Sequence, residues 1–185
     1  SNFGKTEMWL VLDTRENAKV YFGFREGVTK EDFVAAIEKS EQDAGAMPAL
    51  LEEIPVKPGD VFLIPAGTIH AIGAGCLILE AQEPTDFTIE PEAWCDDYHL
   101  SETERFMGLD RGTAISCFDF TATPEQVRHI SRPEAAVLHR EPGCLIESLE
   151  SGAHTDCFFM NRYTLSAACS GGVGLERAPA GLLVV

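Results

Sequence analysis

The chain contains few basic residues. Its 14 lysines and arginines stand against 30 aspartates and glutamates, which gives a formal net charge of −16 at pH 7. Nucleic acids are bound mainly through clustered Lys and Arg side chains that neutralise phosphates. The composition therefore argues against a nucleic-acid partner and against an anionic membrane surface. An anionic small molecule is still compatible with it, provided that a few local cations overcome the overall field.

The sequence also lacks long apolar runs and paired cysteines. No run approaches the ~20 apolar residues of a membrane-spanning helix, and Lys5 and Glu7 interrupt any signal-peptide pattern at the start. The six cysteines are scattered without a C-x2-C pair, so zinc-ribbon and redox motifs find no support. Buried free thiols in a cytoplasmic protein are predicted, in preference to three disulfides in a secreted one.

The most informative stretch runs from Pro58 to His70. A Pro-Gly-Asp turn enters the apolar segment Val61–Ile64, Pro65-Ala66-Gly67 leaves it, and His70 follows. Turn residues at both ends predict a short buried strand with rigid corners, and a metal ligand needs such rigidity. The spacing G-x5-P-x-G-x2-H resembles the second signature of the cupin superfamily. The alternative is a surface hairpin with an incidental histidine.

A second segment, Gly4-Lys5-Thr6-Glu7-Met8-Trp9, leads into another apolar stretch. It is a poor phosphate loop, because the glycine-rich lead is absent and a strand is predicted where a helix should follow. In a cupin barrel the first signature ends in a glutamate ligand, and Glu7 matches that position by resemblance. A glutamate oxygen and a histidine nitrogen together suit zinc or another first-row divalent ion.

Three ordered blocks make the resemblance more specific. Gly4–Trp9, Pro58–Ala71 and Leu79–Asp86 resemble the type I mannose-6-phosphate isomerases (phosphomannose isomerases), a family with two tandem cupin-like units and one zinc ion in the first. The resemblance implies that Glu7 and His70 are zinc ligands and that Lys5, Glu80 and Asp86 are catalytic. It also implies that the remaining ligands, a glutamine and a histidine or the histidine alone, lie upstream of Gly4.

One position departs from the family pattern. The family usually carries an arginine four residues after the pocket aspartate, and this sequence has Glu90 there. The resemblance implies zinc-dependent interconversion of mannose 6-phosphate and fructose 6-phosphate in the cytoplasm, with a small-molecule sugar phosphate as partner. Glu90 would favour a different substrate, as in another cupin isomerase or epimerase. Missing zinc ligands would instead favour a non-catalytic sugar-binding cupin.

The predicted fold is all-β, with double cupin or jelly-roll barrels. We expect a metal-site barrel over 1–90 with a helical insertion at 29–53, a connecting segment over 91–112, and a second, degenerate and apparently truncated cupin-like unit over 113–185. Expected elements include strands at 85–89, 127–130 and 181–185, a helix at 48–53 and another at 101–107. His99, His129, His139 and His154 lack the cupin context and are predicted to be surface or structural residues. The sequence does not predict the oligomeric state.

Overall fold

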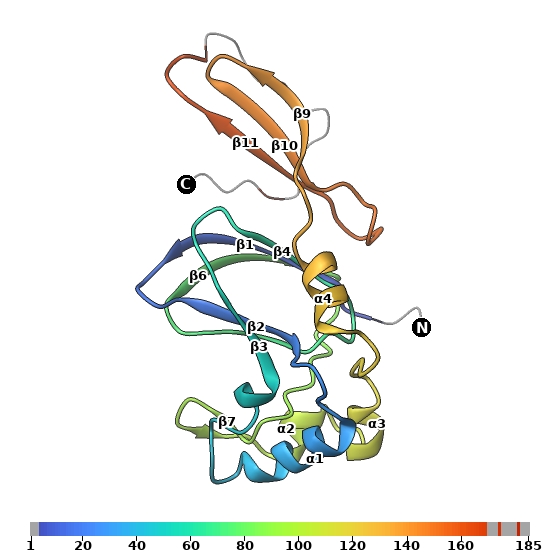
Figure 1. Cartoon of the computed structure of the whole chain (residues 1–185). Coiled ribbons are helices and arrows are strands. Elements are labelled where there is room, and N and C mark those ends of the chain that lie inside the picture. Colours follow the sequence, from blue (N-terminus) through green and yellow to red (C-terminus); the bar gives the residue numbers. More distant parts are fainter. Residues whose placement is uncertain (1–3, 170–173, 175–180, 182–185) are drawn as a thin grey trace. The chain divides into compact units, whose positions relative to one another are not determined.

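The structure, a computed structural model, describes residues 4–169, 174 and 181. The chain divides into two compact units, Ser1–Arg132 and Pro133–Val185. The first unit contains two three-stranded antiparallel sheets (Figure 1). One sheet has the order β4-β1-β6 and the other β3-β2-β5. Their strands are β1 (Glu7–Thr14), β2 (Lys19–Phe24), β3 (Leu51–Pro55), β4 (Val61–Ile64), β5 (His70–Ile72) and β6 (Cys76–Gln82).

The two sheets enclose a buried core. Alternate residues of a strand point to the same face, and on β1 the inward set includes Trp9 and Val11, which pair with inward residues of β4 and β6. From the other sheet, Val20 and Phe22 of β2 join the same cluster. Trp9 and Phe22 meet edge to face, with ring centroids 6.3 Å apart. The predicted all-β, cupin-like architecture is confirmed, and so is the presence of a helical insertion.

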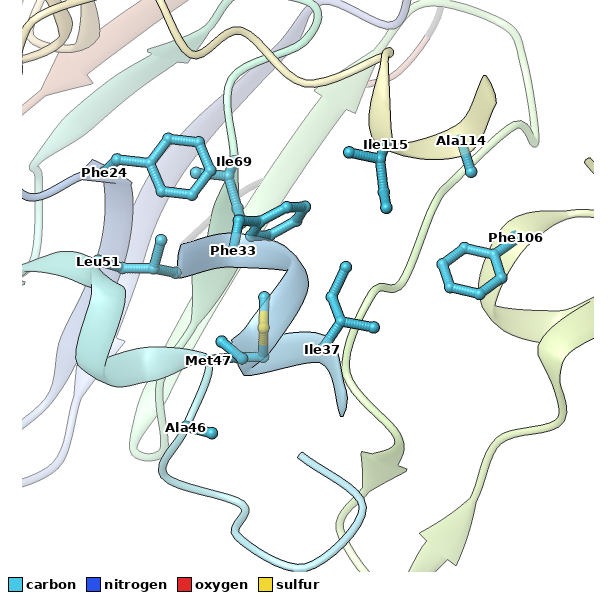
Figure 2. Close-up of a cluster of buried hydrophobic side chains, with 11 residues drawn as sticks. Phe24, Phe33, Ile37, Ala46, Met47, Leu51, Ile69, Phe106, Ala114 and Ile115 are labelled. Atoms are coloured by element: carbon cyan, nitrogen blue, oxygen red, sulfur yellow. The ribbon is translucent and has the colours of Figure 1, made fainter. Parts of the chain in front are cut away.

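The insertion comprises α1 (Lys30–Lys39) and the 3-10 helix η1 (Pro48–Leu50). Thr29 caps α1 through a reciprocal capping box with Asp32, which satisfies amide groups that the helix itself leaves without partners. Figure 2 shows Phe33 and Ile37 of α1 in a second apolar cluster. That cluster also contains Ile69, the residue immediately before β5.

A helical region follows the first sheets. It contains β7 (Trp94–Cys95), β8 (Tyr98–His99), α2 (Glu102–Phe106) and α3 (Arg111–Ile115). Figure 1 places α2 and α3 beside α1, and Phe106 and Ile115 complete the cluster around α1. The helix expected near 101–107 is therefore present as α2.

Several expected elements differ from those observed. Residues 127–130 were expected to form a strand but lie in α4 (Pro124–Ser131), because Thr123 caps a helix that begins with Pro124. The expected strand at 85–89 is irregular. The expected helix at 48–53 ends at Leu50, where β3 takes over. Of the strand expected at 181–185, residues 182–185 lie outside the described part of the chain.

The boundary between the units lies further along the chain than residue 112. Residues 113–132 belong to the first unit, because α4 packs on β2 and β4 and places Val127 in the core between the sheets. The second unit contains one described sheet, β11-β10-β9. Its strands are β9 (Ala136–Glu141), β10 (Cys144–Glu150) and β11 (Met160–Leu165). That this unit is a degenerate second cupin stays a prediction.

The described part of the chain contains short helices. None of its helices combines the length and the apolar character that a bilayer crossing requires.

Candidate metal and sugar site

The inward face of β1 continues beyond the apolar core into polar residues. Lys5, Glu7 and Trp9 alternate along the chain and so share one side of it. Glu7 is paired with Ile64 of β4 and with Gln82 of β6. Glu7 is 3% exposed. The strand period that buries Trp9 and Val11 therefore also carries the Glu7 carboxylate into the mouth of the space between the sheets.

His70 enters the same space from the opposite sheet. It is paired with Phe22 of β2, and its ring lies 5.3 Å from that of Trp9 in an edge-on arrangement. The preceding residue, Ile69, is buried in the helical cluster. Because neighbouring residues of an extended chain point to opposite sides, the anchoring of Ile69 directs His70 towards Glu7.

The two sequence motifs approach each other closely at the start of β1. A Cβ atom on Gly4 would lie 2.4 Å from the Cβ of Ala66, a distance at which one of the two segments would have to move. Ala66 lies in the turn that precedes His70, which is closed by a hydrogen bond from the Thr68 amide to the Pro65 carbonyl, 3.1 Å. Glycine at position 4 therefore lets the strand that carries Lys5 and Glu7 pass beside the histidine turn.

The turn also orients the imidazole. His70 Nδ1 lies 2.7 Å from the Thr68 carbonyl oxygen, which can only accept a hydrogen bond, so Nδ1 carries the proton. Nε2 then faces Glu7 Oε2 at 3.4 Å. Two electron-rich atoms face each other there unless a proton or a cation lies between them. A hydrogen bond from the second ring nitrogen to a carbonyl is the usual support of a metal-binding histidine.

The opposite side of the Glu7 carboxylate is occupied by Lys5. Lys5 Nζ lies 2.8 Å from Glu7 Oε1 and donates a hydrogen bond to Gln82 Oε1 at 2.9 Å. Burial raises the pKa of Glu7, but the hydrogen bonds and charges of His70 and Lys5 outweigh it, so the net pKa lies below its ordinary value. Glu7 is thus held as a carboxylate between a lysine and a histidine.

Glu80 also lies on this face. Its Oε2 accepts a hydrogen bond of 2.8 Å from the indole Nε1 of Trp9, its cross-strand partner. Because the Trp9 ring in turn packs on His70, Glu80 is linked to the site through one aromatic side chain. Glu80 itself is exposed, and its carboxylate is therefore accessible to a ligand from solvent.

The remaining sequence-predicted positions lie outside this cluster. Asp86 is exposed in the irregular segment after β6, and within the described residues no hydrogen bond or ion pair joins it to Lys5, Glu7 or His70. Glu90 donates its backbone N–H to the Arg105 carbonyl at 2.9 Å. The Arg105 guanidinium binds Glu41 at 2.9 Å and also the Pro91 carbonyl. Arg105 therefore holds the segment around Pro91 to the segment that follows α1.

Comparison with known proteins supplies the family. The chain is 32% identical over 169 residues to mannose-6-phosphate isomerase ManA of Bacillus subtilis, an alignment that covers 90% of this chain and 47% of that protein. It is 45% identical over 85 residues to the mannose-6-phosphate isomerase of Streptococcus mutans, covering 46% of this chain and 25% of that protein. The crystal structure of the Bacillus subtilis mannose 6-phosphate isomerase superposes with a TM-score of 0.64 and 26% identity, over 89% of this chain and 46% of that one.

This chain belongs to the mannose-6-phosphate isomerase family. It spans about half the length of the curated relatives that it matches. No family model matches the sequence. Membership therefore rests on individual relatives and on the shared fold.

Glu7 and His70 suit a metal ion both in their ligand atoms and in the distance between them. Zinc binds carboxylate oxygen and imidazole nitrogen at roughly 2.0–2.2 Å, so two such ligands of a tetrahedral site lie about 3.4 Å apart. The observed separation of His70 Nε2 and Glu7 Oε2 is 3.4 Å. The pair supplies two ligands, whereas zinc sites take three or four protein ligands.

Sequence reasoning missed two residues that position the side chains of this site. Gln82 binds Lys5, and Thr68 orients His70. The alternation of β6 could have indicated Gln82, because it lies two residues after Glu80 and so on the same face. The carbonyl of Thr68 carries no sequence signal, since every residue has one.

Proposed function

We propose that this protein is a zinc-dependent aldose–ketose isomerase of the cytoplasm that interconverts mannose 6-phosphate and fructose 6-phosphate. The observation that carries the proposal is the convergence of Lys5, Glu7 and His70 at one mouth of the space between the sheets. Relatives of this chain are named mannose-6-phosphate isomerase, which supports the choice of substrate.

Glu7 and His70 would hold the metal ion, together with ligands from outside this pair. When bound, a zinc ion supplies Lewis-acid stabilisation of negative charge on the sugar oxygens. The Thr68 carbonyl keeps the His70 proton on Nδ1 and so keeps Nε2 available for coordination. The hydrogen bond and charge of Lys5 lower the pKa of Glu7 and so favour its ionised carboxylate, and both features make the pair ready to bind a cation.

Lys5 is proposed to bind the open-chain sugar. An ammonium group carries three donors, and two of these are used by Glu7 and Gln82. The third can donate to a sugar hydroxyl or carbonyl oxygen and stabilise the negative charge that develops on it. Lys5 also places a positive charge at this mouth of a chain whose net charge is −16, where an anionic substrate needs it.

Glu80 is proposed to move the proton. Isomerisation removes the proton from C2 of the open-chain aldose and returns one to C1, while the oxygen at C1 gains a proton and the hydroxyl at C2 loses one. Glu80 is exposed and is held from one side by the Trp9 N–H, which leaves its other oxygen to accept and return the proton. Asp86 lacks such an attachment to the cluster, so we prefer Glu80.

A second candidate is a cupin isomerase or epimerase that acts on another sugar. Glu90 favours it, because an acidic residue occupies the position where the family usually carries an arginine. The neighbouring Arg105 does not replace that arginine, because the residue is only 4% exposed and its guanidinium binds Glu41. Lys5 would then be the main cation facing the substrate.

A coupled isomerase assay on the full-length protein tests the proposal. Mannose 6-phosphate, unphosphorylated mannose and other sugar phosphates are compared before chelation, after chelation and after zinc is restored. We expect turnover of mannose 6-phosphate that is lost on chelation and recovered with zinc. Turnover that survives complete metal removal would overturn the zinc mechanism, and a preference for another sugar would establish the second candidate.

His70→Ala provides the matched binding experiment. We expect zinc affinity at this site to fall at least ~10-fold, because even a change behind a ligand costs about that much. The comparison is His99→Ala, which removes an exposed histidine that binds Glu41 at 2.6 Å. Equal zinc affinity in the two variants would remove His70 from the metal site.

A further inference from the structure

The turn between β9 and β10 gathers three metal-binding side chains. His139 and Glu141 are two residues apart on β9 and share one face, and Cys144 is the direct cross-strand partner of Glu141. Their ligand atoms all lie within 4.8 Å of one another. This cluster, His139–Glu141–Cys144, lies in the second unit and shares no residue with the Lys5–Glu7–His70 site.

The spacing within the cluster suits a first-row metal ion. His139 Nε2 lies 3.5 Å from Glu141 Oε2, and two such ligands of tetrahedral zinc lie about 3.4 Å apart. Thiolate, imidazole and carboxylate together favour Zn²⁺ over Mg²⁺ or Ca²⁺, which take oxygen ligands. The side chains of His139 and Glu141 are about half exposed, 49% and 48%, which provides an entry path, whereas Cys144 is buried.

A second cysteine lies beside the first. A Cβ atom on Gly143 would lie 2.3 Å from the backbone nitrogen of Cys169, so the chain after β11 passes directly over the turn. The backbone N–H of Ser166 donates to the Gly143 carbonyl at 2.9 Å, and the backbone N–H of Cys169 donates to the Ser166 carbonyl at 2.9 Å. Burial raises the pKa of the Cys144 thiol, and the charges of Cys169 and Glu141 raise it further.

We propose that this turn is a zinc site in which His139, Glu141 and Cys144, whose ligand atoms already lie together, are ligands and that Cys169 moves in from the adjacent segment to complete the set. The bound ion would tie the β9–β10 turn to the segment after β11 and would balance the negative charge of Glu141 and the thiolates. Its role is structural, because all four ligands come from the protein and structural zinc sites are closed in this way. It thereby differs from the catalytic site proposed in the first unit.

Cobalt is the probe that separates the two sites. Reduced, metal-free protein is titrated with Co²⁺, and we expect a thiolate-to-cobalt charge-transfer band in the near ultraviolet that Zn²⁺ abolishes. The Glu7–His70 pair contains no thiolate, so the band should persist in His70→Ala. Loss of the band in His70→Ala, or its absence from the unaltered protein, would overturn the proposal.

Variants assign the ligands. We expect His139→Ala and Cys144→Ser to weaken cobalt binding at least ~10-fold, and His139→Ala, at an exposed position, leaves the core intact. Cys169→Ser should reduce the band intensity per bound ion, because one thiolate is lost; an unchanged intensity would exclude Cys169. Cys157→Ser, which removes an exposed cysteine of the same unit, is the control, and a band that survives Cys144→Ser contradicts the assignment.

Discussion

At the scale of single residues, Glu80 and Asp86 differ in what holds them. Glu80 accepts a hydrogen bond from Trp9, whose ring packs on His70, whereas Asp86 is exposed on an irregular segment. We therefore expect Glu80→Gln to lower kcat for mannose 6-phosphate about 10²-fold or more, as loss of a general acid–base group does. Asp86→Asn should change kcat by no more than a few-fold, measured by steady-state kinetics.

Trp9→Phe distinguishes chemistry from positioning. It removes the N–H donor to Glu80 and keeps an aromatic ring against His70, so we expect a smaller loss of kcat than in Glu80→Gln. If Trp9→Phe and Glu80→Gln lose kcat equally, with the same pH profile, Glu80 acts only by holding Trp9. A larger loss in Asp86→Asn would reverse the assignment.

Glu7 should make the stability of the first unit depend on pH. Its pKa in the folded state lies below the ordinary value of 4.5, so its stabilising contribution is present above about pH 4.5 and is lost as the pH falls through the folded-state pKa. We expect Glu7→Gln to lower the free energy of unfolding by about 1.5–3 kcal/mol at neutral pH, the range for hydrogen bonds to charged groups.

Urea titrations of metal-free protein at several pH values provide the measurement. The difference between the unaltered protein and Glu7→Gln should shrink as the pH is lowered below 4.5. Glu26→Gln, in the exposed turn after β2, is the control. A difference that stays constant down to the acid transition would contradict the role assigned to the Glu7 charge.

Sequence reasoning reached part of this site. The turn residues around Val61–Ile64 and the alternation of Lys5, Glu7 and Trp9 are local signals, and local signals suffice to predict short strands and their inward faces. Contacts between the motifs were inferred from family resemblance, because pairing between distant strands leaves no local mark. The roles of Glu7 and His70 as ligands stay proposals, although the structure brings the two side chains together.

At the scale of elements, α4 depends on Thr123, the residue that caps its start. The Thr123 side chain accepts a hydrogen bond from the backbone N–H of Gln126, and the Gln126 side chain accepts one from the backbone N–H of Thr123. Because Val127 of α4 is part of the core between the sheets, loss of the cap should be measurable in the first unit. We expect Thr123→Ala to lower the free energy of unfolding by about 1 kcal/mol.

Chemical denaturation followed by circular dichroism tests this expectation. Thr123→Ser keeps the hydroxyl, and its free energy of unfolding should lie within ~0.5 kcal/mol of that of the unaltered protein. Thr88→Ala, at an exposed position of the irregular segment after β6, controls for the change of side chain away from a helix start. Equal destabilisation by Thr123→Ala and Thr123→Ser would show that the cap is not responsible.

The same helix shows where element prediction failed. Val127 and Ile130 suggested a strand because apolar residues in a short window fit either period. The capping pattern Thr123-Pro124-Glu125-Gln126 indicates a helix, and in the structure it prevails over the apolar pattern. The irregular segment at 85–89 is a different case: β-branched and aromatic residues favour a strand there, and tertiary context overrides that preference.

At the scale of the whole molecule, the charge of −16 should oppose compactness. Like charges in a compact chain repel one another, and raising ionic strength from about 0.01 M to about 0.15 M shortens the screening length from ~30 Å to ~8 Å. We expect the urea midpoint of this chain to rise over that range of NaCl, because exposed ion pairs are worth only ~0–1 kcal/mol each.

The comparison uses sucrose at matched osmolality, which changes hydration without screening. A midpoint that falls with NaCl would show that specific ion pairs, such as Lys19–Glu53 at 2.7 Å, outweigh the overall repulsion. Measurements at neutral pH keep the acidic side chains ionised and the net charge near its formal value.

Division of the chain into units was predicted less well than the class of its fold. Composition and turn residues identify a β-rich protein, since those signals are summed over many positions. A boundary depends on which element packs against which core, and α4 joins the first unit because its Val127 side chain is part of the core between the sheets. Such packing is a long-range contact that no short window of sequence contains.

The adjacency of Ile69 and His70 has a mechanical consequence. One peptide unit joins a side chain held by the helical cluster to one that faces the polar mouth, so the two regions cannot shift independently. A ligand that draws the imidazole inwards must pull on the packing around α1, and a substitution there that loosens Ile69 must widen the range of imidazole positions. The helical insertion thus restricts the position of the imidazole ring through Ile69, although the insertion contributes none of the described polar side chains that contact the ring.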